Sequence, residues 1–249
     1  MELPRTFTIR ERNHRIHNPF SAGKLATLGR ALHLRPGTSI LDLACGSGEM
    51  LCTWSRDHGV TGTGVDISTP FLAAARSRAA DLGVADKVTF VHGDAGGYVA
   101  AEPVDVAACI GATWIGDGVA GTLELLRRSL RRPGGLLLVG EPFWLADPPD
   151  RATLEACHAQ SKDTFRDLPG LVTQFGDLGY DLVEMVLADG DSWDRYVAAQ
   201  WFAIRTWLDE NPDDELAPAF RAELDTAPLN HVRYQRQYLG WGVFALMHR

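Results

Sequence analysis

Between residues 39 and 141 the chain alternates apolar, strand-like segments with segments of helical spacing. The strand-like runs occupy 39–44, 60–67, 87–94, 104–111 and 134–141, and the helical segments occupy 46–59, 69–82 and 122–130. Neighbouring parallel strands need a crossover connection, and that connection is usually a helix. The alternation therefore predicts an α/β fold whose doubly wound, mostly parallel sheet is covered by helices on both faces.

The segments on either side of this alternation have different patterns. A helix is expected over 20–33, where Pro36 and Gly37 follow and stop it. After a proline-rich stretch at 142–150, we expect a helix to about Phe165, a second helix over 170–178 and a strand over 180–188. Residues 191–239 are predicted to form a long helical insertion, and the apolar run at 240–249 a final strand.

The net charge disfavours nucleic-acid partners, and the charged residues are unevenly distributed along the chain. The formal net charge is −8, which disfavours stable binding to DNA or RNA unless a local basic stripe overrides it. The first 17 residues contain Arg5, Arg10, Arg12 and Arg15, whereas residues 189–225 contain ten carboxylates against three arginines. A basic N-terminal arm and an acidic helical segment are expected.

Neither a membrane span nor a metal site is expected. No apolar run approaches the roughly 18–20 residues that cross a bilayer, and the N-terminus has no apolar signal region, so a cytoplasmic protein is predicted. The four cysteines are scattered without a Cys-x-x-Cys pair, which argues against zinc and against a disulfide framework.

The loop after the first strand-like segment is the strongest candidate for a ligand site. It reads ILDLACGSGEM, an apolar strand with Asp42 followed by Gly46, Ser47 and Gly48 at the start of a helix. Glycines allow the backbone to approach a ligand closely, and a helix N-terminus offers unpaired N–H groups to an anion. Open α/β sheets bind ligands at this edge, beyond the carboxyl ends of the strands.

Asp66, at the end of the second strand-like segment, sharpens this interpretation. A carboxylate there can accept hydrogen bonds from both hydroxyls of an unphosphorylated ribose. A nicotinamide dehydrogenase would share Asp66, but its Gly-x-Gly-x-x-Gly pattern requires a third glycine where this chain has Leu51. A nucleoside ligand other than a dinucleotide is therefore favoured.

Five ordered motifs resemble those of the class I S-adenosylmethionine-dependent methyltransferases. ILDLACGSG resembles their first motif, and the resemblance continues in GTGVDIS (62–68), HGDAGGY (92–98), VDVAACIGATW (104–114) and RRPGGLLLVGEPFW (131–144). Over its full length the chain is also similar to the YjhP-type bacterial methyltransferases, which share HRIHNPF, CTWSRDHG and GWGVFAL. The resemblance implies a Rossmann-like seven-stranded sheet with an antiparallel last strand, a helical N-terminal arm and the helical insertion between strands six and seven.

We accordingly expect one methyltransferase domain over residues 1–249. Its parts are an N-terminal arm and helix (1–35), a cofactor-binding core (36–141), a substrate-side segment (142–169) and the helical insertion (191–239). The cofactor implied is S-adenosylmethionine, with S-adenosylhomocysteine as its product and no metal.

The same resemblance assigns the cofactor-binding residues. It implies that Gly46 and Gly48 cradle the methionine portion and that Asp42 orients the loop and reaches the ammonium group through water. It implies further that Ala44 belongs to the cofactor site, that Asp66 binds the ribose, and that Ile67, Asp94 and Ala95 border the adenine. It places Cys109 and Ile110 beneath the transferable methyl group.

The catalytic and acceptor-binding candidates rest on fewer observations. Glu141, His17 and His14 are candidate bases, and Trp114 and Trp144 are candidate contacts for the acceptor. Arg15 is a further candidate for the acceptor site, where it could pair with an anion of the acceptor or with the cofactor carboxylate. Each has a structural alternative. Glu141 could hold a structural hydrogen bond, the tryptophans could serve packing alone, and the segment around His17 could start a helix with Asn18 as its cap and Pro19 in its first turn.

The activity predicted is methyl transfer to a small molecule by in-line displacement, with oxygen, nitrogen, carbon or sulfur as the acceptor atom. Two alternatives stay open: a non-catalytic S-adenosylmethionine-binding protein, and a methyltransferase of protein or RNA, which the acidic charge disfavours. A monomer or a homodimer is expected.

Overall fold

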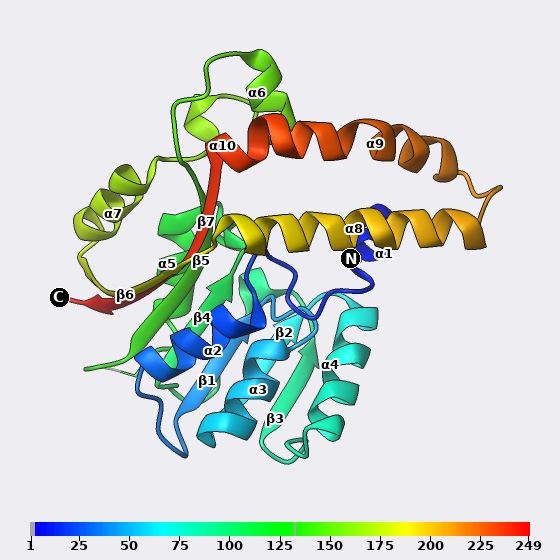
Figure 1. The fold of residues 1–249 in the computed structure, drawn as a ribbon. Coiled ribbons are helices and arrows are strands. Elements are labelled where there is room, and N and C mark those ends of the chain that lie inside the picture. The colour runs from blue at the N-terminus through cyan, green and yellow to red at the C-terminus, as the bar shows by residue number, and fades with distance from the viewer. Residues whose placement is uncertain (1–2, 132) are drawn as a thin grey trace.

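The computed structural model describes residues 3–131 and 133–249 (Figure 1). Residues 1–2, at the start of the predicted arm, and Arg132, in the predicted fifth-strand motif, lie outside the described residues. The chain forms a seven-stranded sheet in the order β3-β2-β1-β4-β5-β7-β6. The strands are β1 (Ser39–Leu43), β2 (Thr61–Asp66), β3 (Val88–His92), β4 (Val106–Ile110), β5 (Leu136–Trp144), β6 (Tyr180–Leu187) and β7 (Leu239–His248).

The first five strands are parallel and the last strand is antiparallel, as predicted. β1 pairs in parallel with β2 and β4, and β7 lies antiparallel between β5 and β6. From β1 the chain moves outward to β2 and β3, then returns to the other side of β1 to form β4 and β5. The order reverses between β1 and β4, which is where open α/β sheets bind ligands.

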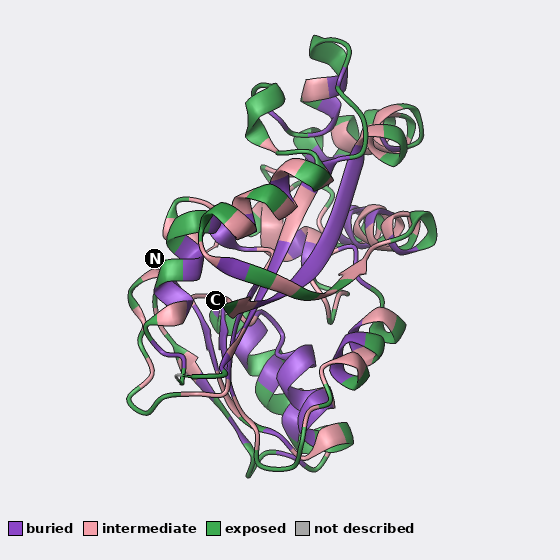
Figure 2. Ribbon diagram, turned by 90° about the vertical axis from the view of Figure 1, so that its left-hand side faces the viewer, coloured by how far each residue is buried: buried purple, intermediate pink, exposed green. Residues whose placement is uncertain are grey.

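Helices cover both faces of the sheet. One face is packed by α2 (Ala22–Ala31), α3 (Glu49–His58) and α4 (Thr69–Asp81), and the other by α5 (Val119–Arg127) and α7 (Leu168–Asp177). Figure 2 shows the central strands largely buried, whereas the helices present buried and exposed faces. This is the pattern expected of helices that each cover the sheet with one apolar stripe.

Two boundaries differ from the sequence prediction. The helix expected over 20–33 spans Ala22–Ala31 and is capped by Ser21, whose side chain accepts a hydrogen bond from the Lys24 N–H, so the alternative of a cap at Asn18 is not what the structure has. The helix expected up to Phe165 is shorter, since α6 spans Arg151–Ala156 and is followed by a separate short turn, η3 (Lys162–Thr164). His158 has a positive φ of 57°, a backbone conformation that ends helical winding.

The N-terminal arm and the insertion lie together above the carboxyl edge of the sheet (Figure 1). The arm contains α1 (Arg5–Glu11), and the insertion contains α8 (Gly190–Glu210), α9 (Ala217–Asn230), a π-helical turn (His231–Gln235) and α10 (Arg236–Tyr238). α1 packs on α8, and α8 packs on α9. In residues 3–131 and 133–249, no helix combines the length and the apolar character that a membrane crossing requires.

The basic arm and the acidic insertion, which differ in charge in the sequence, contact each other through ion pairs. Arg5 pairs with Asp214 at 2.8 Å, and Arg12 pairs with Glu210 at 3.0 Å. Arg10 binds Glu223 through two hydrogen bonds of 2.7 and 2.5 Å. The basic arm is therefore docked on the acidic insertion.

Candidate donor-binding site

The glycine-rich loop between β1 and α3 passes through the left-handed backbone region at three residues. Ala44, Gly46 and Gly48 have positive φ angles of 58°, 53° and 68°. A side chain on Gly48 would come within 2.7 Å of the Phe90 ring, so packing as well as backbone conformation requires glycine there. The loop turns directly into α3, whose first N–H groups face the carboxyl edge of the sheet.

Asp66 shapes this loop from the neighbouring strand. Its Oδ2 accepts a hydrogen bond from the Gly46 N–H at 2.8 Å, and its Oδ1 accepts one from the Ser68 N–H at 2.8 Å. An ionised carboxylate has about four lone-pair sites, so two remain for a ligand. Asp94 is similar: its Oδ1 accepts from the Gly96 N–H at 2.9 Å, which leaves Oδ2 without a partner among the described residues.

A cavity of about 690 Å³ lies above this edge of the sheet. It is lined by eleven of the residues that the sequence singled out: Arg15, His17, Asp42, Ala44, Gly46, Asp66, Ile67, Asp94, Ala95, Ile110 and Trp114. We call it the donor cavity. Its volume lies within the range of small-molecule and cofactor sites.

Asp42 is the most perturbed acid of the donor cavity. Burial, with a smaller contribution from the charge of Asp66, raises its pKa to about 8. No hydrogen bond holds its carboxyl group in the part of the chain that the structure describes. A buried acid without a partner is costly to ionise, and a cationic ligand beside it would remove that cost.

The N-terminal arm forms the roof of the donor cavity. His17 lies over the glycine loop, with its Nε2 3.0 Å from the Ser47 Oγ and its ring in edge contact with Phe71. Burial lowers the pKa of His17. Asn18 donates from Nδ2 to the Ile110 carbonyl at 3.1 Å, and its Oδ1 lies where a side chain on Gly111 would otherwise project.

A buried polar cluster fastens this roof to α8. Glu11 accepts hydrogen bonds from the Tyr196 hydroxyl at 2.9 Å and from Gln200 at 2.6 Å. Burial opposes its ionisation, but hydrogen bonding and charge from His14, the charge of His17 and the Gln200 bond outweigh burial and hold the pKa of Glu11 below its ordinary value. His14 lies between the two elements, with Nδ1 3.1 Å from Glu11 and Nε2 3.1 Å from the Tyr196 carbonyl.

Glu141 is a second perturbed acid beside the site. It lies in β5, next to the strand that carries Ile110, and accepts a hydrogen bond from the Thr113 hydroxyl at 2.8 Å. Burial raises its pKa to about 7, against the opposing effect of the Thr113 bond. Such a group can take up or release a proton near neutral pH.

Five of the residues predicted from the sequence do not line the donor cavity: His14, Gly48, Cys109, Glu141 and Trp144. Gly48 packs against Phe90 below the loop, and the Cys109 side chain is fully buried in the core under β4. The geometry does not support an acceptor contact for Trp144. β5 runs three residues further than predicted, so its indole lies beyond the cavity, donates to the Lys162 carbonyl at 2.8 Å and packs on Phe165.

Sequence reasoning missed most of the apolar lining. The arm contributes Leu3, Pro4, Phe7, Ile16 and Phe20, and α4 contributes Phe71. Phe7 meets Phe71 edge to face, with ring centroids 6.1 Å apart. The signal available was the HRIHNPF motif, which includes Ile16, Asn18 and Phe20.

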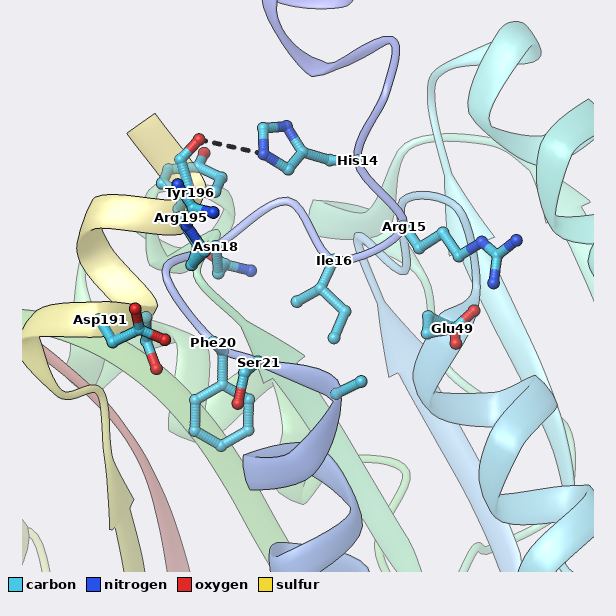
Figure 3. A pocket seen from close by; sticks show the side chains of 12 residues that line it. His14, Arg15, Ile16, Asn18, Phe20, Ser21, Glu49, Asp191, Arg195 and Tyr196 are labelled. Carbon is cyan, nitrogen blue, oxygen red and sulfur yellow. Dashed lines mark hydrogen bonds between the residues drawn. The ribbon is translucent and has the colours of Figure 1, made fainter. Parts of the chain in front are cut away.

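A second, smaller cavity of about 250 Å³ adjoins the donor cavity (Figure 3). The two share Arg15, Ile16, Asn18, Phe20 and Glu49. The remaining lining comes from His14, the start of α2 and the first turns of α8. Residues 14–20 therefore contribute to the lining of both cavities.

Comparisons with known proteins agree with this geometry. Residues 40–135 match the family described as Methyltransferase domain. The chain is 59% identical to the YjhP protein of Escherichia coli strain K12 over 249 residues, which covers all of both chains. It is 36% identical to the ubiquinone/menaquinone biosynthesis C-methyltransferase UbiE of Pseudomonas entomophila, over 83% of this chain and 71% of that protein.

A solved structure extends the similarity to three dimensions. The S-adenosylmethionine-dependent methyltransferase of Geobacter sulfurreducens, crystallised with S-adenosylhomocysteine, is 61% identical. It superimposes with a TM-score of 0.97 and covers all of this chain and 99% of that one.

The residues of the donor cavity suit an adenosyl sulfonium ligand. An unpartnered buried acid, two acids with free oxygens and a glycine loop at a helix N-terminus face one apolar space. Among residues 3–131 and 133–249, no cluster of three or more His, Cys, Asp or Glu side chains could hold a metal ion.

Proposed function

Because the chain belongs to the S-adenosylmethionine-dependent methyltransferases, we propose that it transfers the methyl group to a small-molecule acceptor by in-line displacement. The observation that supports this is the donor cavity, in which the glycine loop, Asp42 and Asp66 meet under a roof formed by the arm. The net charge of −8 disfavours a nucleic-acid acceptor. The UbiE relative is named for methylation in quinone biosynthesis, which supports a small acceptor.

The residues of the cavity have distinct roles in this proposal. Bound S-adenosylmethionine supplies a methyl carbon that its sulfonium has already activated. Asp66 accepts the ribose hydroxyls, Asp94 and Ile67 border the adenine, and Asp42 compensates positive charge at the methionine end. Trp114, at the cavity rim, contributes an aromatic wall. The protein contributes mainly alignment and exclusion of water.

An acceptor that loses a proton on methylation also needs a base. Glu141 is our candidate, because its pKa of about 7 allows it to accept a proton near neutral pH and it lies beside the β4 edge of the cavity. His17 is less suited, since its Nε2 is engaged with Ser47. His14 is engaged between Glu11 and Tyr196 and serves the roof.

Replacement of Asp66 tests the donor site. We expect Asp66→Ala to raise the dissociation constant of S-adenosylhomocysteine by roughly 10- to 100-fold, because hydrogen bonds to charged groups contribute about 1.5–3 kcal/mol. Isothermal titration calorimetry on the full chain measures this. Asp105→Ala, which removes a carboxylate bound to Ser39 away from the cavity, is the matched control. An unchanged affinity in Asp66→Ala would remove the ribose assignment.

Glu141 is tested by separating binding from turnover. We expect Glu141→Gln to bind S-adenosylhomocysteine within about twofold of the wild type and to lower methyl transfer by about 10²- to 10⁴-fold. The assay uses methyl-labelled S-adenosylmethionine with an acceptor found in a panel of small metabolites. In Thr113→Val the pKa of Glu141 should rise further, so the activity profile should move to higher pH. Full activity in Glu141→Gln would exclude this base.

The same assay separates the alternative functions. A chain that binds the donor but methylates nothing in a broad panel of small molecules, proteins and RNA would be a non-catalytic binding protein. Label found in protein or RNA alone would identify a macromolecular substrate.

A further inference from the structure

One side of the donor cavity is formed by the end of β4 and the turn that follows it. The residues that line it there are Ile110, Gly111, Ala112, Trp114 and Ile115, and none of these five carries a charge. We call them the β4 side. The three aspartates of the cavity are assigned to the donor in the proposed function, so the β4 side is an apolar wall that remains for a second ligand.

The other charged side chains of the donor cavity lie at the start of α3. Arg15 extends in that direction, on the side where Glu49 lies (Figure 3). Glu49 is bound by Arg78 through two hydrogen bonds of 2.8 and 2.9 Å. Arg15 has neither an ion pair nor a hydrogen-bond partner for its side chain within residues 3–131 and 133–249. An anionic acceptor would therefore be attracted to the α3 end, whereas the β4 side suits an uncharged one.

Asn18 reaches the β4 side from the arm. Its Nδ2 donates a hydrogen bond to the Ile110 carbonyl at 3.1 Å. Because a carbonyl oxygen only accepts hydrogen bonds, this contact fixes the orientation of the amide and turns Oδ1 the other way. Oδ1 lies where a side chain on Gly111 would project, and no described residue donates a hydrogen bond to it. The β4 side thus has an acceptor oxygen that is fixed in position and free for a ligand.

Trp114 forms the outer end of the β4 side. It is 68% exposed, so packing alone does not account for its position. The turn that carries it is held in place, since the Thr113 hydroxyl donates to Glu141 at 2.8 Å and the Thr113 carbonyl accepts from the Thr122 hydroxyl at 2.8 Å. An exposed indole on a fixed turn is a surface on which a planar ring can stack.

We propose that the β4 side binds an uncharged aromatic acceptor, whose ring stacks on Trp114 and whose hydroxyl or N–H group donates a hydrogen bond to Asn18 Oδ1. The inference rests on the proposed function and names the class of its acceptor. Asn18 is a specificity-determining residue in this proposal. A compound that lacks the O–H or N–H group leaves the amide oxygen unpaired, and such a site discriminates against it.

A labelling screen tests the class of acceptor. Methyl-labelled S-adenosylmethionine is offered with the full chain to uncharged phenols, anilines and indoles, to the same scaffolds carrying a carboxylate, and to aliphatic alcohols and amines. We expect label in the uncharged aromatic set. Preferential label in the carboxylated set would overturn the proposal and favour Arg15 as the acceptor contact, and preferential label in the aliphatic set would overturn it too. No transfer to any compound, with S-adenosylhomocysteine still bound, would instead refute the proposed function itself.

A pair of ligands tests Asn18 directly. The pair is the best acceptor of the screen and its analogue without the O–H or N–H group, and competition assays give the affinity of each. We expect the wild type to bind the acceptor about 3- to 10-fold more tightly than the analogue. In Asn18→Ala this preference should disappear, while the affinity for S-adenosylhomocysteine should fall by less than about threefold.

Asn13→Ala is the matched control, because Asn13 is an exposed asparagine of the same arm that lines neither cavity. It should leave the preference and all three affinities unchanged. A preference that persists in Asn18→Ala would overturn the proposal. Equal weakening of the acceptor, its analogue and S-adenosylhomocysteine would also overturn it, because it would indicate a displaced arm.

Two substitutions test the stacking surface. Trp114→Ala should raise the KM for the best acceptor by about 10-fold, whereas Trp114→Phe should keep most of the wild-type value, because a ring remains. Neither should change the affinity for S-adenosylhomocysteine by more than about threefold. Equal KM values in the wild type and Trp114→Ala would show that the acceptor does not stack there.

Discussion

At the scale of single residues, Asp42 and Asp66 differ in how their carboxyl groups are held. Its carboxyl group is buried, has no hydrogen-bond partner among the described residues and lies near a second acid, Asp66. Asp66, by contrast, is held by two backbone N–H groups. Such an arrangement destabilises the ligand-free protein and is compensated when a cation binds.

The Asp42 carboxyl group gives a pH prediction with a defined sign. Its folded-state pKa of about 8 lies above the ordinary value of 3.8, so the folded protein retains a proton that the unfolded chain releases. The contribution of Asp42 to the free energy of unfolding therefore falls as pH rises from about 4 to about 8, and it stays constant above pH 8. We expect the free energy of unfolding of Asp42→Asn, relative to that of the wild type, to increase by about 2–4 kcal/mol between about pH 5 and pH 8.

Urea denaturation of both ligand-free proteins at several pH values measures this difference. Asp105→Asn is a control of opposite sign, because hydrogen bonds from Ser39 and the charge of Arg131 outweigh burial and lower its pKa. Parallel pH curves for the wild type and Asp42→Asn would show that Asp42 ionises normally in the folded protein.

At the scale of elements, the arm and the insertion act together. α1 alone is a helix of seven residues, too short to be stable in isolation. It is held by α8 through the cluster around Glu11 and by α9 through Arg10, whose guanidinium also lies 5.4 Å from the Phe220 ring. The roof of the donor cavity therefore depends on segments about 200 residues apart in sequence.

Arg10→Met tests this coupling. The half-buried, two-bond pair with Glu223 should contribute more than an exposed pair, so amide hydrogen exchange over residues 5–11 should become faster while β1 and β4 remain protected. S-adenosylhomocysteine affinity should fall by a few fold, because the arm lines the donor cavity. Arg5→Met, whose pairs are exposed, should change little. Unaltered exchange over 5–11 in Arg10→Met would show that the arm is held by other contacts.

Some elements could be predicted from the sequence and others could not, for identifiable reasons. The buried strands β1 to β5 and the helix after the glycine loop carry strong local patterns, and they were predicted correctly. The helix predicted over 20–33 begins two residues later, at Ala22, because Ser21 caps it. Asn18, a good capping residue by type, instead holds the arm on β4. The far end of β5 was missed because this proline-containing strand end is stabilised by pairing with distant residues, those of β7 and, at Trp144, Asp167.

At the scale of the whole molecule, the sequence by itself determined the fold class and the place of the glycine-rich loop in it. Alternating periodicity requires a covered parallel sheet, and glycines between a buried strand and a helix, beside two acids, predict a ligand loop at the carboxyl edge of that sheet. The charge asymmetry was likewise visible, although the sequence could not say that the two charged segments meet.

Only the tertiary structure decided which side chains share a cavity. The roof over the glycine loop, the burial that raises the pKa values of Asp42 and Glu141, the exclusion of Trp144 and the unpaired state of Arg15 all depend on contacts between distant segments. Local sequence sets backbone preferences within a few residues, whereas burial and pairing are properties of the assembled fold.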